Sequence, residues 1–361
     1  MKYSFAKKLR VALLGYGKVA DLHAQALVGT KDADLATVCG RNRARRDAFA
    51  AKWGISSRET VEEAVLKDKI DAVIVSVPHP QHKASALEAL EAGCHVLVEK
   101  PMALNTPECD AMIAGARKAG KVLSVMSQRR FFPACARMKE AILAGKIGKP
   151  SIAQLTILGW RDEAYYASDS WRGKWSSEGG GILINQAPHQ IDLMLWFMGP
   201  FAELRGFWGN VNHPYIEVED TAVAAVKFAN GGFGSVLASN SQKPGIYAKV
   251  HIHGEAAASV GVQTDGGAMF IAGMSSIAEP PLNDLWTIAG EEKLLDRFRA
   301  EDEAFFKTID PTIHFFTLQF NDFFGAIIEG RAPLVSAEDG RETVRFIETL
   351  YGGAINHDHS N

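Results

Sequence analysis

A glycine-rich turn near the start of the chain has residue types suited to binding pyrophosphate. It is Gly15-Tyr16-Gly17-Lys18-Val19-Ala20, which follows an apolar run and precedes a helical pattern. Backbone N–H groups at the N-terminus of a helix bind phosphate when no side chain stands in the way. Gly15 would allow the tight turn, Gly17 the approach of phosphate, and Ala20 the packing of helix on strand. We therefore expect a dinucleotide-binding turn, the alternative being a plain strand–helix connection.

The segment Cys39-Gly40-Arg41-Asn42-Arg43-Ala44-Arg45-Arg46 bears on which dinucleotide binds. It stands at the end of the second predicted strand, where an acidic residue would bind the ribose hydroxyls of NAD. No carboxylate occurs there before Asp47. A 2′-phosphate would instead meet Arg41, unless these arginines only form the solvated first turn of the next helix. The segment favours NADP over NAD and places Gly40 and Arg41 among the cofactor-binding residues.

Lys100 lies in the segment Glu99-Lys100-Pro101, at the carboxyl end of the predicted strand 94–98. A lysine there can donate to a substrate oxygen and stabilise the charge that develops on it. Pro101 constrains the backbone and is a candidate for a cis peptide bond that directs the lysine inward. The alternative is a surface lysine in a turn.

Asn185, His189 and Asp192 follow three glycines, Gly179 to Gly181, which permit close approach of the backbone to a ligand or another element. Their spacing of four and then three residues would place them on one face of a helix. Asparagine is a good N-cap residue, so we expect that helix to start near Asn185 and to end near residue 197. Pro188 then lies in the first turn, where its missing N–H has no partner in any case.

Histidine is suited to removing the hydroxyl proton during oxidation of an alcohol, because its pKa lies near neutral pH. His189 is therefore the candidate general base, with Lys100 supporting the substrate oxygen. Asn185 can hydrogen-bond substrate hydroxyls but cannot carry the proton, and Asp192 could bind a hydroxyl or orient His189. A histidine satisfied by structural contacts is the alternative.

Aromatic rings alternate with hydrogen-bonding groups in residues 160–166 and in Trp171-Arg172-Gly173-Lys174-Trp175. Apolar faces of sugars stack on rings while charged groups bind hydroxyls. We therefore expect Tyr165, Arg172 and Trp175 to contact substrate. The alternative is that these rings pack the core or an oligomer interface.

Composition excludes several classes of function. The chain has 361 residues, with 39 basic against 42 acidic side chains, and so offers no electrostatic ground for binding nucleic acid or an anionic membrane. Its four cysteines lie far apart, as expected for a reducing compartment, and residues 1–8 are too polar for the apolar region of a signal sequence. We expect a cytoplasmic protein. We expect no metal, because the pairs His79/His82 and His251/His253 have no apparent carboxylate or cysteine partner.

The elements that position these residues follow two patterns. Through the first third of the chain, short apolar strands alternate with helices, which is typical of a doubly wound parallel sheet with its ligand crevice at the carboxyl ends of the strands. The predicted strands are 9–14, 35–39, 72–76, 94–98 and 122–127, and the predicted helices are 19–27, 43–53, 61–66, 83–92 and 107–119.

Past residue 131 the predicted strands are longer, and Asn230-Gly231-Gly232 is a hairpin signal. This pattern predicts an α+β domain with a largely antiparallel sheet. We therefore expect a dinucleotide-binding Rossmann domain over 1–131 and a second domain over 132–361. The later strands are expected at 151–158, 202–211, 221–228, 233–238 and 248–253, and two helices at 315–329 and 338–350.

Several of these segments together resemble the Gfo/Idh/MocA oxidoreductases, named for glucose–fructose oxidoreductase, inositol dehydrogenase and a rhizopine catabolism protein. The resemblance runs nearly end to end. It rests on the glycine turn 15–20, on Ser76-Val77-Pro78-His79-Pro80-Gln81-His82, on Glu99-Lys100-Pro101, and on the stretch from Gly179 to Asp192.

The resemblance implies reversible oxidation of a hydroxyl on a sugar or cyclitol by a nicotinamide cofactor, and a homo-oligomer (dimer or tetramer) formed through the C-terminal sheet. It implies that this sheet is open and that the second domain, over 132–361, serves substrate binding and oligomerisation. It places Lys100 in the catalytic set, and Glu99 and Pro101 beside cofactor and substrate. Many members carry aspartate at the position of Asn185, and asparagine at that of His79. By the same resemblance, Ser76, Pro78 and His82 lie along the adenosine and ribose side of the cofactor.

The expected site has three overlapping sets. The catalytic residues are Lys100, His189 and Asn185. The cofactor-binding residues are Gly15, Tyr16, Gly17, Lys18, Val19, Ala20, Gly40, Arg41, Ser76, Val77, Pro78, His79, His82, Glu99, Lys100 and Pro101. The substrate-binding residues are Lys100, Tyr165, Arg172, Trp175, Asn185, His189 and Asp192.

These residues predict an NAD(P)-dependent dehydrogenase or reductase that acts on a sugar, sugar derivative or cyclitol. Two alternatives stay open at this point. One is an enzyme that retains its cofactor and oxidises and re-reduces a single substrate, as NAD-dependent glycosidases do. The other is a non-catalytic regulator that binds a dinucleotide.

Overall fold

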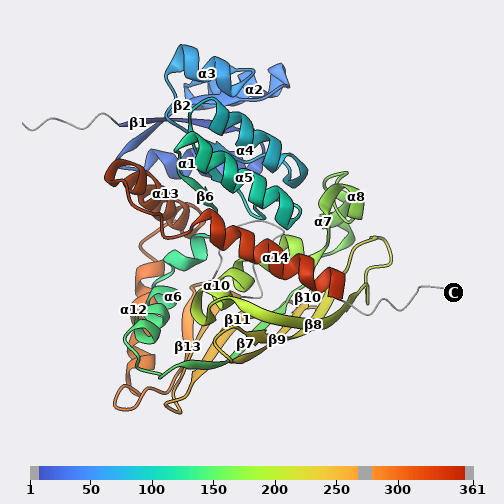
Figure 1. Cartoon of the computed structure of the whole chain (residues 1–361), viewed down its shortest axis with the longest axis vertical. Helices are drawn as coiled ribbons and strands as arrows, with labels where there is room; N and C mark the ends of the chain where they lie inside the picture. Colours follow the sequence, from blue (N-terminus) through green and yellow to red (C-terminus); the bar gives the residue numbers. More distant parts are fainter. Residues whose placement is uncertain (1–7, 267–278, 354–361) are drawn as a thin grey trace, which may run out of the picture. The chain divides into compact units, whose positions relative to one another are not determined.

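The computed structural model describes residues 8–266 and 279–353, so the polar N-terminal segment and residues 267–278 lie outside the described residues. The chain packs into two compact units (Figure 1). The first comprises residues up to 128 together with 312–341, and the second comprises 129–311 and the residues from 342 onward. No helix within the described ranges has the length and apolar character needed to cross a membrane.

The first unit is built on a six-stranded sheet in the order β3-β2-β1-β4-β5-β6. Every neighbouring pair is parallel, which confirms the predicted doubly wound sheet. Its strands are β1 (Leu9–Leu14), β2 (Ala33–Cys39), β3 (Ser56–Arg58), β4 (Ala72–Val75), β5 (His95–Val98) and β6 (Leu123–Val125). Its helices include α1 (Lys18–Val28), α2 (Arg43–Trp53), α3 (Val61–Asp68), α4 (His82–Glu91) and α5 (Thr106–Ala119).

A helix from late in the chain completes the core of the first unit. It is α13 (Pro311–Glu329), whose Phe316 and Phe320 pack edge-on against His23 of α1 at ring distances of 5.1 and 5.5 Å. Gln319 accepts a hydrogen bond from the Ser127 N–H at 2.9 Å and donates to the Val125 carbonyl at 2.8 Å. The compact units therefore group α13 with the Rossmann sheet, while the domain boundary expected at residue 131 stays a prediction.

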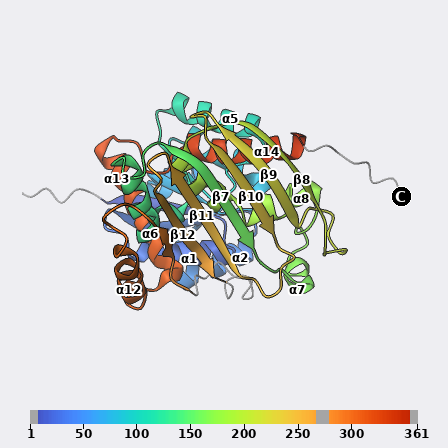
Figure 2. The ribbon, with the colours of Figure 1, turned by 90° about the horizontal axis from the view of Figure 1, so that it is seen from below.

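The second unit is built on a seven-stranded sheet in the order β13-β12-β11-β7-β10-β9-β8 (Figure 2). Within the described part of this sheet, β7 and β10 are the only strands that pair in parallel, which confirms a largely antiparallel sheet. Its strands are β7 (Pro150–Leu158), β8 (Phe201–Gly209), β9 (Thr221–Phe228), β10 (Phe233–Ser239), β11 (Tyr247–Gly254), β12 (Ser259–Gly266) and β13 (Leu282–Trp286). The strands β12 and β13 were not predicted from the sequence.

Helices of the second unit cover one face of its sheet. They are α6 (Pro133–Leu143), which packs on β12 and β13, α10 (Pro188–Met198), which packs on β7 and β11, and α12 (Leu294–Phe306), which packs on β13. Figure 2 shows the strands from the opposite side, where no described helix of this unit crosses them. The last helix of the chain is α14 (Ala337–Gly353), and its residues from 342 onward pack within the second unit.

The helix expected to start at Asn185 begins instead at Pro188, so this prediction was wrong. Asn185 ends a separate short helix, α9 (Ile182–Asn185), and the Ala187 N–H donates back to the Ile182 carbonyl at 2.9 Å. This turn interrupts the helical path between the two segments. Pro188 does occupy the first turn of α10, as predicted. Of the three polar residues, only His189 and Asp192 therefore share a helix.

Candidate active site

The predicted pyrophosphate turn lies at the edge where strands β1 and β4 end. Gly15 has φ +118°, and a Cβ atom there would lie 2.7 Å from the Ser76 carbonyl oxygen. Gly17 is the N-cap residue of α1, and no side chain caps the helix there. A Cβ atom built at Gly17 would have no neighbouring atom within 4 Å. Lys18 and Val19 begin the helix and Ala20 is buried against the sheet. The uncapped N–H groups beside Gly17 fit a pyrophosphate.

The end of β2 brings Gly40 against the ring of Tyr16. Gly40 has φ +153°, and a Cβ atom there would lie 2.4 Å from that ring. The Tyr16 hydroxyl accepts a hydrogen bond from the Asn42 N–H at 3.0 Å. Arg46 is buried and donates to the Gly40 carbonyl at 2.7 Å, so it supports this turn. Arg41 is exposed, and no hydrogen bond or ion pair involves it within the part of the chain that the structure describes.

The loop after β4 is connected to the Glu99-Lys100-Pro101 segment by a buried histidine. His82 is fully buried, with Nδ1 2.8 Å from the Pro101 carbonyl oxygen and Nε2 2.9 Å from that of Val77. Burial lowers the pKa of His82, although the two carbonyl groups act in the opposite direction. Pro78 is exposed and His79 is half-buried, with its ring 5.8 Å from that of His82. The peptide bond between Lys100 and Pro101 is cis, as predicted.

Glu99 positions the backbone beside Lys100. Its N–H donates to the Val75 carbonyl at 2.9 Å, and its carboxylate accepts from the Lys100 N–H at 3.0 Å. The other carboxylate oxygen lies 2.9 Å from Nε2 of His23. Burial acts to raise the pKa of Glu99, but His23 and Lys100 outweigh it, and the pKa is lowered. Glu99 is therefore an ionised group that supports the turn in which half-buried Lys100 stands.

In the second unit, α10 carries His189 and Asp192. His189 stands in the first turn and is 7% exposed. Asp192 is buried, and both of its carboxylate oxygens accept from Arg130, at 2.8 and 2.6 Å. The Arg130 guanidinium lies 5.1 Å from the Trp196 ring centre. This pair gives Asp192 a structural role, and its expected contact with substrate stays a prediction. Lys100 and His189 belong to different compact units.

The segment around Asn185 is connected to the arginine–aromatic loop through a buried carboxylate. Glu178 ends the short helix α8 (Trp175–Glu178) and accepts from the Gly173 N–H at 2.6 Å and from the Asn185 side-chain amide. The Tyr165 hydroxyl accepts from Arg172 at 2.7 Å and from the side chain of Gln186 at 3.3 Å. The structure thus connects the segments of Tyr165, Arg172 and Asn185, while their contact with substrate stays a prediction.

Trp175 lies at the edge of this group. Its indole N–H donates to the Glu217 carbonyl at 2.9 Å, and its ring packs against Trp208 and Tyr351 at 5.3 Å each. About a third of the residue, 36%, is exposed. These contacts match the structural alternative for the ring, and a contact with substrate stays a prediction.

The three glycines permit close approach to another part of the chain. A Cβ atom at Gly181 would lie 1.8 Å from the Glu219 carbonyl oxygen, and one at Gly180 would lie 2.1 Å from the Tyr351 hydroxyl. The buried Glu219 carboxylate accepts from the N–H groups of Gly181 and Leu183, at 2.8 and 3.0 Å, and from Tyr351 at 2.8 Å. Glu219 therefore positions the start of α9, and the sequence analysis missed it.

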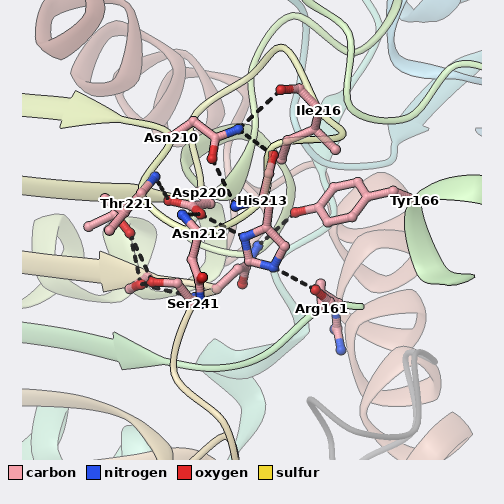
Figure 3. Close-up of polar contacts among 12 residues, drawn as sticks. Arg161, Tyr166, Asn210, Asn212, His213, Ile216, Asp220, Thr221 and Ser241 are labelled. Atoms are coloured by element: carbon pink, nitrogen blue, oxygen red, sulfur yellow. Dashed lines mark hydrogen bonds and ion pairs between the residues drawn. The ribbon is translucent and has the colours of Figure 1, made fainter. Parts of the chain in front are cut away.

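A second buried network, also missed, positions the chain just before Tyr165. His213 is fully buried, with Nδ1 2.6 Å from an Asp220 oxygen and Nε2 2.7 Å from the Arg161 carbonyl (Figure 3). The Arg161 guanidinium lies 4.8 Å from the Tyr165 ring centre. Hydrogen bonding to His213 lowers the pKa of Asp220, against the effect of burial. One local signal was present, because Glu219 and Asp220 form an acidic pair directly before a predicted strand.

Two family models match the chain. One, described as an oxidoreductase family with an NAD-binding Rossmann fold, matches residues 9–127. The other, described as the GFO/IDH/MocA C-terminal domain, matches residues 135–260.

Known proteins similar to this chain include two dehydrogenases. The scyllo-inositol 2-dehydrogenase (NAD(+)) of Bacillus subtilis strain 168 is 31% identical over 247 residues, or 66% of this chain and 69% of that protein. The D-glucoside 3-dehydrogenase of Escherichia coli strain K12 is 30% identical over 250 residues, or 62% of this chain and 68% of that protein. A crystal structure of the WlbA dehydrogenase from Bordetella pertussis, in complex with NADH and UDP-GlcNAcA, matches with a TM-score of 0.83, 24% identity and 96% coverage of both chains, which shows a shared fold.

These matches confirm the resemblance carried by the glycine turn, the Glu99-Lys100-Pro101 segment and the stretch from Gly179 to Asp192. They also confirm that the chain is an oxidoreductase with an NAD-binding Rossmann fold. This chain belongs to the Gfo/Idh/MocA family of oxidoreductases.

Proposed function

We propose that this enzyme transfers a hydride between a nicotinamide cofactor and a hydroxyl or keto carbon of a sugar, sugar derivative or cyclitol. The observation that carries the proposal is the open, uncapped start of α1 at Gly17, beside the carboxyl ends of β1 and β4. Relatives named as glucoside and inositol dehydrogenases support the substrate class. The cluster of Tyr165, Arg172 and Asn185 supplies rings and hydrogen-bonding groups for a polyol.

The residue roles follow from their chemistry. The nicotinamide, when bound, accepts or supplies the hydride at the reacting carbon. Lys100 donates to the substrate oxygen and stabilises the negative charge that develops there. His189 removes the hydroxyl proton during oxidation and returns it during reduction. Asn185 hydrogen-bonds a substrate hydroxyl and takes no part in proton transfer.

For the cofactor, we propose a preference for NADP over NAD. Exposed Arg41 follows β2, where a 2′-phosphate would be bound, and no hydrogen bond or ion pair within residues 8–266 and 279–353 occupies it. We expect Arg41→Ala to weaken NADP binding about tenfold, as for loss of one charge-assisted hydrogen bond, and to leave NAD binding unchanged. Calorimetric titration of both cofactors measures this. The control is Arg43→Ala, since Arg43 is also exposed but lies 3.5 Å from Asp47. Equal losses for NAD and NADP would contradict the preference.

We also propose that the chain forms a homo-oligomer, a dimer or tetramer, through the face of the second sheet that its own helices leave uncovered. Large apolar side chains on that face support the proposal, and they are Ile152, Phe207, Val223, Phe233 and Leu237. A cytoplasmic location is proposed on the four cysteines, which are all buried thiols without a disulfide.

The central experiment is turnover of a panel of sugars and cyclitols with NAD and with NADP, followed by nicotinamide absorbance in both directions. We expect one class of polyol to be oxidised, and His189→Ala to lower kcat by about a hundredfold or more, as for loss of a general base. If no sugar or cyclitol of the panel were oxidised or reduced, the proposal would be contradicted. Release of the leaving group of a glycoside without net change in absorbance would favour the cofactor-retaining alternative. Cofactor binding that is indifferent to sugars and to Lys100→Ala would favour a regulator.

A further inference from the structure

Glu178 is a buried carboxylate between the two segments that we assign to substrate binding. The residue is 1% exposed, and it accepts from the Gly173 N–H at 2.6 Å and from the amide nitrogen of Asn185. Gly173 follows Arg172 directly in the chain, and Asn185 precedes Gln186. One carboxylate therefore connects the loop that carries the arginine with the turn that carries the asparagine.

A second connection runs parallel to the first. The Tyr165 hydroxyl accepts from Arg172 at 2.7 Å and from Gln186 at 3.3 Å. The Arg172 guanidinium also lies 4.5 Å from the Tyr165 ring centre. Residues 172–173 and 185–186 are thus joined twice, once through a phenol and once through a carboxylate. Of these two connections, the one through the carboxylate includes the Asn185 amide, which we expect to bind a substrate hydroxyl.

We propose that Glu178 is a positioning residue that orients the Asn185 amide, turning its nitrogen toward the buried carboxylate and offering its oxygen to a substrate hydroxyl. The inference rests on the proposed function. An amide whose nitrogen donates to a carboxylate has its oxygen at the opposite end, and a carbonyl oxygen accepts up to two hydrogen bonds. A free amide can flip and present either group, whereas the negative charge of Glu178 selects one orientation. The pair therefore selects a donor, such as the O–H of a polyol.

The same contact makes a carboxylate unsuitable at position 185. Two carboxylates in contact inside the protein cannot both ionise without strong repulsion, so one keeps its proton to a higher pH. Arg161 and Arg172 are the cations near this pair, because both act together with Glu178 on the Tyr165 hydroxyl. The charge of Glu178 also affects Tyr166 and Tyr351. Asparagine is the residue that both fills this position and donates to Glu178.

The first test is steady-state kinetics of Glu178→Gln. The Gly173 N–H and the Asn185 amide donate to different oxygens of Glu178, and a glutamine has an NH2 group in place of one of them. One donor therefore loses its acceptor, and the Asn185 amide loses its fixed orientation. We expect KM for the polyol to rise about tenfold while kcat changes less than about threefold, because the lost contact binds ground state and transition state alike. Unchanged KM in an active variant would overturn the proposal.

The matched control is Ser177→Ala. Ser177 stands beside Glu178 in α8 and donates to the Trp171 carbonyl at 2.7 Å, so it supports the same loop without contacting Asn185. We expect its KM to match that of the wild type. A rise in KM as large as that of Glu178→Gln would show that the loop as a whole, and not the amide, is responsible, and would overturn the proposal.

The second test needs neither cofactor nor substrate. In Asn185→Asp, a shared proton raises the folded-state pKa of the carboxylate pair, so the variant is most stable at low pH and loses stability as pH rises. We expect its melting temperature, relative to the wild type, to fall between pH 5 and pH 8. The double variant Glu178→Gln/Asn185→Asp should show a flat difference over the same range. Subtracting the melting temperature of the wild type at each pH removes the effect of other groups that titrate in all three proteins.

If the difference in melting temperature between Asn185→Asp and the wild type were the same at every pH, the coupling of Glu178 to residue 185 would be contradicted. This measurement of the melting temperature also tests the inference separately from the proposed function. If the wild type turned over no polyol, the proposed function would fail, and the pH dependence of the melting temperature would still decide whether Glu178 and residue 185 are coupled.

Discussion

Glu219 illustrates how a single buried side chain makes the second unit sensitive to pH. Burial raises its pKa to about 7, although hydrogen bonds from Leu183, Tyr351 and Gly181 favour the ionised form. In the unfolded chain an ordinary glutamate titrates near 4.3. Between these values the folded state holds a proton that the unfolded state has released. The resulting stabilisation is fully present below the unfolded pKa and is lost as pH rises toward 7.

We therefore expect the free energy of unfolding of the wild type to fall, relative to Glu219→Gln, by on the order of 3 kcal/mol between pH 4.5 and pH 8. Glutamine does not titrate, so the difference isolates the carboxyl group. Urea unfolding at several pH values measures it. The control is Glu217→Gln, a substitution of the same type two residues away at an exposed position, measured in the same way. A flat difference for Glu219→Gln as well would show that its pKa is not raised.

At the same scale, sequence reasoning singled out candidate chemical residues but not the buried carboxylates that position their segments. Asn185 and His189 stood out because polar groups followed three glycines. Glu178 and Glu219 did not stand out, because a glutamate is usually exposed and the neighbouring sequence does not indicate that it is buried. The ion pair of Asp192 with Arg130 was not foreseen, because Arg130 lies 62 positions earlier in the chain and pairing over that distance depends on the fold.

At the scale of elements, the turn between β1 and α1 contains two glycines, Gly15 and Gly17, that serve different roles. Gly15 has φ +118° and would place a Cβ atom against the Ser76 backbone, so its role is to let two strand ends approach. Gly17 has φ −86° and open space where a Cβ atom would stand, so its backbone accepts any residue. We infer that the first glycine serves the fold and the second serves the cofactor.

The corresponding prediction compares two alanine variants of the protein without cofactor. Gly15→Ala should lower the free energy of unfolding by about 1–3 kcal/mol, because alanine is strained at positive φ and meets backbone. Gly17→Ala should unfold like the wild type but bind NAD or NADP at least about tenfold more weakly, because its methyl group occupies the approach of the pyrophosphate. Chemical unfolding and calorimetric titration separate the two effects. A destabilised Gly17→Ala with normal cofactor binding would contradict the assignment.

Most elements of the first unit could be predicted because its strands are buried on both faces and form uninterrupted apolar runs. The strand β3 (Ser56–Arg58) was missed because its three residues are polar and lie at the edge of the sheet. The helix start at Asn185 was wrong for a tertiary reason. Glu219 binds the N–H groups at the start of α9, which produces an extra turn that local capping rules do not foresee.

For the whole molecule, the uncovered face of the second sheet is the surface through which we propose that copies of the chain associate. Leu237, Val223 and Phe207 stand in one row across β10, β9 and β8, and Ile152 stands beside Phe233 on β7 and β10. All five are between 38% and 62% exposed in the single chain. Large apolar side chains exposed together on one face of a folded unit are typical of an interaction site.

Phe233→Glu tests whether this face joins two copies of the chain. Phe233 is 62% exposed, so the substitution should not disturb the fold of a monomer. In a two-fold interface every residue occurs twice, so two unpaired carboxylates would be buried at once. We expect the dissociation constant of the oligomer to rise by at least about a hundredfold, measured by sedimentation equilibrium. Leu143→Glu is the control, since Leu143 is 74% exposed at the end of α6, which packs on the covered face. An oligomer that resists Phe233→Glu, or a wild type that sediments as a monomer, would refute assembly through this sheet.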